Sequence, residues 1–97
     1  MAVETVAFEP DQYFQSAEAQ QYLLTEALAS GHAGHIADAI GIIARNRGMA
    51  AIAEETGLNR QALYAAFSET GNPTLSTLLK VLDALDMELA VRVRVAA

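Results

Sequence analysis

The chain has 97 residues, of which 53% are hydrophobic and 19% are charged, and these values are typical of one globular domain. The absence of cysteine excludes disulfides and thiolate metal sites, and no apolar run approaches the ~20 residues that a membrane-spanning helix needs. Because the first residues also lack a basic leader followed by an apolar segment, we expect a single cytoplasmic domain over 1–97.

The net charge of −6 is distributed unevenly along the chain. Residues 1–44 carry six acidic residues and no Lys or Arg, whereas residues 45–97 carry six acidic and six basic residues. Nucleic-acid phosphates repel acidic proteins, but here the half that holds every base has no net charge. This asymmetry predicts two kinds of partner, one basic and one anionic; the alternative is a solvated acidic surface that only aids solubility.

A pair of helices is expected over residues 16–47. Ser16 is suited to cap a helix over 17–29, and Gly31 lies just past its end. After a short connection, apolar residues recur at helical spacing as far as Arg47, and Gly48 ends the second helix. The apolar positions are Ala19, Tyr22, Leu23, Ala27 and Leu28 in the first helix, and Ile36, Ala37, Ile40, Ile43 and Ala44 in the second.

Residues 48–68 have the spacing of a helix-turn-helix. Ile52 and Ala53 share one face of a short helix over 49–56, Gly57 supplies the turn, and Leu63 lies on the core face of a second helix over 60–67. Two helices cross this closely only if the residue facing the partner helix is small, as Ala53 is, and if the turn residue accepts a positive φ, as Gly57 does. An ordinary helix hairpin is the alternative.

A fifth helix is expected over 74–86 and a β-strand over 87–95. Pro73 holds the residue before it out of the helical region, and Thr74 is suited to cap the helix. From Met87 the period changes to two, and β-branched residues alternate with polar or small ones. The predicted fold class is therefore all-α, with five helices and a short C-terminal strand. The apolar positions of the fifth helix are Leu75, Leu78, Leu79, Leu82 and Leu85.

A single strand leaves its backbone groups unpaired and needs a partner. Either the same strand of a second molecule across a two-fold axis or the run from Val3 to Phe8 can supply it. We favour the homodimer, because a two-fold dimer suits DNA half-sites that repeat at about one helical turn. The dimerisation residues are then Leu89, Val91, Val93 and Val95.

The second helix of the helix-turn-helix presents residue types that read base edges and phosphates. Gln61 has the amide needed for adenine, and Arg60 has donors for a guanine edge or a phosphate. Asn59 either reads a base or caps its helix, and Tyr64 either bonds a phosphate or packs into the core. Two arginines before the motif either hold a phosphate or stabilise the end of the preceding helix. The candidate DNA-binding residues are Arg45, Arg47, Asn59, Arg60, Gln61 and Tyr64.

No combination of residues indicates an enzyme, a cofactor or a metal site. His32, His35 and Asp38 recur at a spacing of three, but Gly31 and Gly34 beside them indicate a loose helix start, and a stable site needs further ligands. The chain has no GxSxG motif, no phosphate-binding glycine loop and no histidine paired with a plausible nucleophile.

Several short motifs occur together between Phe8 and Leu89. They are FEPDQY at 8–13, GIIAR at 41–45, RGM at 47–49, IAEETGL at 52–58 and GNPT at 71–74, with Tyr22, Leu23, Arg60, Leu63 and Tyr64. In combination they resemble a HigA-type antitoxin of the addiction-module antidote family, in the lambda-repressor-like helix-turn-helix class. The resemblance implies an antitoxin of a type II toxin–antitoxin pair that neutralises a small, basic, RelE-like ribonuclease by direct binding. It also implies that the chain represses the shared operon by binding double-stranded DNA at its own operator.

Two positions depart from that pattern: Ala65, where similar chains often have a base, and Asp86, where they often have glycine. Arg60 is consequently the only cation on the second helix of the motif, which predicts few phosphate contacts and a shallow salt dependence of DNA binding. Two other functions stay open, a stand-alone repressor without a toxin and a protein-binding helical module that has lost DNA contact.

Overall fold

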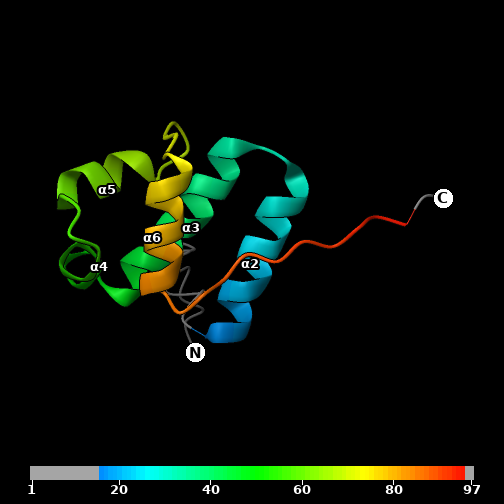
Figure 1. Ribbon diagram of the computed structural model, residues 1–97, viewed down its shortest axis with the longest axis horizontal. Helices are drawn as coiled ribbons and strands as arrows, with labels where there is room; N and C mark the ends of the chain where they lie inside the picture. Colours follow the sequence, from blue (N-terminus) through cyan, green and yellow to red (C-terminus); the bar gives the residue numbers. More distant parts are fainter. Residues whose placement is uncertain (1–15, 96–97) are drawn as a thin grey trace, which may run out of the picture.

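The computed structural model describes residues 16–95, which form five α-helices and no strand (Figure 1). The all-α prediction is confirmed for this part of the chain, and each helix lies close to its expected position. The helices are α2 (Ala17–Ser30), α3 (Ala33–Arg47), α4 (Met49–Thr56), α5 (Arg60–Ala66) and α6 (Leu75–Ala84). None of them is long and apolar enough to cross a lipid bilayer.

Side-chain caps explain where three of the helices begin. The Ser16 hydroxyl accepts a hydrogen bond from the Ala19 N–H at 3.1 Å, and the Thr74 hydroxyl accepts one from the Thr77 N–H at 3.2 Å. Asn59 caps α5 in the same way. Such caps satisfy N–H groups that have no partner within the helix, and each contributes about 1 kcal/mol.

The core forms around α3, which contacts α2, α4 and α5, while α6 packs on α4 (Figure 1). Along the middle of α3 the side chains are almost wholly buried, and Ile40 and Ile43 are at most 1% exposed. Burying a side chain of this size stabilises the fold by about 1.5–3 kcal/mol. The largest fully buried side chains are Phe67, Ile40, Ile43, Ile52, Leu63, Leu82, Leu85 and Val81.

Gly41 lets the end of α5 lie directly against α3. A Cβ atom at this position would collide with the Phe67 carbonyl oxygen. The close approach places the Phe67 side chain, 1% exposed, in the core. This contact fixes the position of α5 relative to the rest of the domain.

The strand predicted over 87–95 is not supported by the described chain, in which these residues form no regular structure. Figure 1 shows the segment leaving the end of α6 as an extended chain. Val91, Val93 and Val95 are 86–96% exposed and Leu89 is 42% exposed. The alternating pattern indicates a strand only if a partner supplies backbone hydrogen bonds. Two partners were predicted for the strand. The first is a second copy, which a single chain does not contain, and the second is the run 3–8, which lies outside the described residues.

Candidate nucleic-acid interface

Helices α4 and α5 are joined by three residues whose geometry is held by local hydrogen bonds. Gly57 adopts φ 72° and donates its N–H to the Ala53 carbonyl at 2.9 Å, which ends α4. The Thr56 hydroxyl donates to the Ile52 carbonyl at 2.7 Å and accepts from the Leu58 N–H at 3.2 Å. The partly buried Leu58 then packs against the core. The turn is thus a fixed connection between the two helices.

The core contacts of α5 determine which of its side chains face solvent. Leu63 and Phe67, each 1% exposed, hold one side of the helix against the core. Arg60 and Gln61 are exposed in the first turn, and Tyr64 is 44% exposed one turn later. Tyr64 therefore does not pack fully into the core. The structure brings a guanidinium, an amide and a phenol together on the solvent side of one short helix.

Asn59 caps α5, as one of its two predicted interpretations required. Its Oδ1 accepts hydrogen bonds from the N–H groups of Gln61 at 2.8 Å and Ala62 at 3.1 Å. A bidentate contact to adenine also needs this oxygen as an acceptor. Reading a base through Asn59 would therefore compete with the cap, whereas the Gln61 side chain caps no helix among the described residues.

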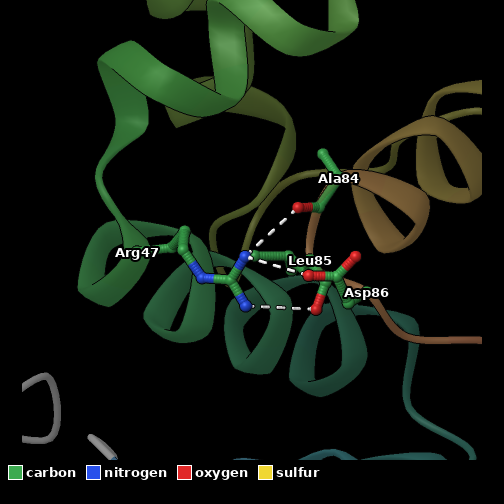
Figure 2. A network of polar contacts seen from close by, with 4 residues as sticks. All are labelled: Arg47, Ala84, Leu85 and Asp86. Atoms are coloured by element: carbon green, nitrogen blue, oxygen red, sulfur yellow. Dashed lines mark hydrogen bonds and ion pairs between the residues drawn. The ribbon is translucent and has the colours of Figure 1, made fainter.

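Arg47 binds the C-terminal end of α6, a role that the sequence analysis missed (Figure 2). Its Nη1 donates to the Ala84 carbonyl at 3.3 Å and its Nη2 donates to the Leu85 carbonyl at 3.2 Å. Nη1 also lies 3.7 Å from Oδ2 of Asp86. The last carbonyls of a helix have no partner within it and carry partial negative charge, so a cation there is stabilising. Arg47 was expected to stabilise the end of its own helix or to hold a phosphate; it joins α3 to α6 instead.

Asp86, at the start of the C-terminal segment, has a positive φ of 57°. Glycine adopts this conformation without steric cost, whereas a residue with a Cβ atom rarely adopts it. The Met87 N–H donates to the Leu82 carbonyl at 2.9 Å, and the Met87 side chain packs against the core. Asp86, where glycine was expected, therefore occupies a backbone conformation that favours glycine. It lies next to the guanidinium of Arg47.

The six predicted DNA-binding residues thus fall into two groups. Asn59, Arg60, Gln61 and Tyr64 belong to α5 and the residue before it. Arg45 and Arg47 lie in the last turn of α3, where Arg45 is partly buried with Nη1 beside Gly41. Only the first group forms a continuous surface on one helix.

Two histidines lie close together at the start of α3. The ring centroids of His32 and His35 are 4.9 Å apart and the rings are tilted by 56°. Within the described range 16–95, no three histidine, aspartate or glutamate side chains are grouped so that they could hold a metal ion. The pair therefore provides no candidate metal centre.

Comparison with known proteins adds the following findings. A family model described as "Probable addiction module antidote protein" matches residues 4–93. An uncharacterized protein of Haemophilus influenzae is 40% identical over 85 residues, which cover 88% of this chain and 88% of that protein. No solved structure matches the chain.

Proposed function

Because the chain belongs to the family of probable addiction module antidote proteins, which suggests an antitoxin role, we propose that it is the HigA-type antitoxin of a type II toxin–antitoxin pair. It acts in the cytoplasm by binding rather than by catalysis. The observation that carries the proposal is the extent of the family match, which spans residues 4–93 of 97.

The proposed protein partner is a basic, RelE-like toxin, which the antitoxin neutralises by direct contact. Charge supports this part of the proposal, since residues 1–44 have six acids and no Lys or Arg. Complementary charge accelerates association and selects between partners. In the described part of this half, Glu18 and Glu26 are exposed on α2.

The proposed DNA partner is the operator of the chain's own operon, read by α4 and α5 as a helix-turn-helix. The exposed Arg60 and Gln61 support the proposal, because they stand in the first turn of α5, where recognition helices contact base edges. Tyr64 would add a phosphate contact. Asn59 would contribute mainly as a cap, and Arg47 would contribute by joining α3 to α6.

We also propose that two copies associate through the C-terminal segment. Val91, Val93 and Val95 are 86–96% exposed in this segment, and Leu89 is 42% exposed. A second copy would cover them. Deleting residues 89–97 should then convert a dimer into a monomer in sedimentation, and an unchanged mass would contradict the proposal.

Co-expression with the product of the neighbouring gene tests the antitoxin role. We expect that product alone to stop growth, and co-expression of the chain to restore growth and to allow the two proteins to be purified together. No rescue and no complex would contradict the antitoxin role. Specific DNA binding without rescue would identify a stand-alone repressor.

Electrophoretic mobility shifts on the upstream DNA test the repressor role. We expect a specific shift that Arg60→Ala weakens, with the slope of log K against log salt reduced by about 0.9 for each lost phosphate contact. Lys80→Ala, which removes an exposed cation from α6 instead of α5, is the matched control and should leave the shift unchanged. If no specific shift occurs with or without the toxin, the chain is a protein-binding module.

A further inference from the structure

A hollow of about 300 Å³ lies between α2 and α3, on a surface that the proposed DNA contacts do not use. Apolar and polar side chains from both helices line it. The apolar lining residues are Leu23, Ala27, Ala39 and Ile42, and the polar ones are Glu26, Ser30, His35 and Asp38. The hollow therefore suits an apolar side chain that is accompanied by a positive charge.

The surface beside the hollow has the same character. Glu18, Tyr22 and Glu26 are exposed and follow one another at four-residue spacing on α2, so they share one side of the helix. Tyr22 is 65% exposed. No Lys or Arg precedes Arg45, so no basic residue of α2 or the first part of α3 offsets these carboxylates. An exposed aromatic next to carboxylates is a common feature of surfaces that bind arginine.

The C-terminal segment has the complementary pattern. Val91, Val93 and Val95 alternate with Arg92 and Arg94, so an extended chain places valines on one side and guanidinium groups on the other. Residues 87–95, when extended, span about 30 Å, which is enough to cross both helices. The side chains of Arg92 and Arg94 are long and flexible. They can therefore turn back toward the carboxylates of the hollow that the neighbouring valines have entered.

We propose that the hollow between α2 and α3 receives the C-terminal segment of a second copy of this chain, with valine side chains inside it and Arg92 or Arg94 paired with Glu26. The proposal deepens the dimer part of the proposed function by naming the surface that receives the segment. Two copies would exchange segments reciprocally, which makes the contact isologous.

Charge and exposure distinguish the C-terminal segment of a second copy from the two terminal segments of the same chain. Within one chain the segment does not enter the hollow, since its valines stay 86–96% exposed. The first fifteen residues contain Glu4, Glu9 and Asp11 and no base, so their charge has the same sign as that of the carboxylates of the hollow. The C-terminal segment of this chain carries the opposite charge together with the apolar side chains.

Sedimentation equilibrium of the full-length chain tests the proposal with charge-reversal variants. We expect the wild-type chain to be a dimer, and both Glu26→Arg and the double variant R92E/R94E to raise the dissociation constant about tenfold or more. Glu54→Arg, which reverses an exposed charge on α4, is the matched control and should leave the constant unchanged. Circular dichroism verifies that each variant keeps its helix content.

Mixing the two weakened proteins gives the sharper result. In an E26R chain paired with an R92E/R94E chain, both exchanged contacts again join opposite charges. We therefore expect an equimolar mixture to recover the dimer at a concentration where each variant alone is monomeric.

Four outcomes would overturn the proposal. A monomeric wild-type chain would remove the dimer altogether. An E26R chain as dimeric as the control would leave the dimer of the proposed function standing but place the segment elsewhere. A mixture that stays monomeric would exclude exchange between copies. An E26R variant that remains dimeric but no longer co-purifies with the neighbouring gene's product would assign the hollow to that protein.

Discussion

Replacing Arg47 with methionine isolates the contact between α3 and α6. Methionine keeps an unbranched stem of comparable reach along the helix but removes the charge and every donor. The Ala84 and Leu85 carbonyls then lose the partners that lie 3.3 and 3.2 Å away. We expect a folded protein with lower stability and unchanged helix content.

The expected loss follows from the geometry of the contacts. A hydrogen bond from a charged group contributes about 1.5–3 kcal/mol when it is short and buried. Here both bonds exceed 3.1 Å and the Arg47 side chain is 43% exposed, so each is reduced to about 0.5–1 kcal/mol. The ion pair adds little, because Asp86 is 89% exposed. The total of about 1–2 kcal/mol corresponds to a fall of about 5–12 °C in Tm for a domain of this size.

Thermal unfolding followed by circular dichroism measures this loss, and Asp86→Gly is the control. D86G removes the ion pair but keeps both carbonyl acceptors, and it places glycine at the φ of 57°. We expect its Tm to equal or exceed that of the wild type. A Tm for R47M within about 2 °C of the wild type, or an equal fall in both variants, would refute the assignment of the stabilisation to the two carbonyl bonds.

Three further substitutions test other parts of the fold through the free energy of unfolding. Gly41→Ala places a methyl group against the Phe67 carbonyl, so it should lower the free energy of unfolding by about 1–3 kcal/mol. An unchanged free energy would contradict the close approach of α5 to α3. Asn59→Ala should lower the free energy of unfolding by about 1 kcal/mol. Asn59→Asp should leave it unchanged, because Asp also accepts hydrogen bonds from the two N–H groups. An equal free energy of unfolding for the two variants would contradict the cap. Leu63→Ala should lower the free energy of unfolding by about 2–5 kcal/mol, because this side chain is 1% exposed. Urea unfolding measures the loss, and a loss below about 1 kcal/mol would contradict the place of Leu63 in the core.

The helices were predictable because their signals are local. Each capping side chain accepts a hydrogen bond from an N–H group two or three residues later in the chain, so a few neighbouring residues determine where the helix begins. The capping residues are Ser16, Asn59 and Thr74. Gly57 likewise ends α4 with a positive φ that its residue type permits. The side of α5 that faces solvent followed from the same reasoning, because Leu63 is the apolar residue of its middle turn.

The contacts of Arg47 and the C-terminal segment were not predictable in this way. Arg47 reaches carbonyls 37 and 38 residues later, and nothing local to RGM distinguishes that role from a phosphate contact. The collision that makes Gly41 necessary also involves a carbonyl 26 positions away, although a glycine inside a helical pattern is itself a signal of close packing. For residues 87–95 the period of two predicts a strand, but a strand depends on a partner that one chain does not contain.

The distribution of the bases links the proposed dimer to the proposed DNA binding. Of the six bases, Arg47 joins α3 to α6, Arg45 is partly buried beside Gly41, Lys80 lies on α6, and Arg92 and Arg94 lie on the C-terminal segment. Arg60 is therefore the only cation on α5, and one cation per half-site gives weak electrostatic attraction to DNA. Two half-sites joined in one dimer bind far more tightly than either alone, because the second contact becomes intramolecular. If both proposals hold, Glu26→Arg should weaken operator binding although Glu26 lies on α2 and not on α5, and added protein concentration should restore it by restoring the dimer.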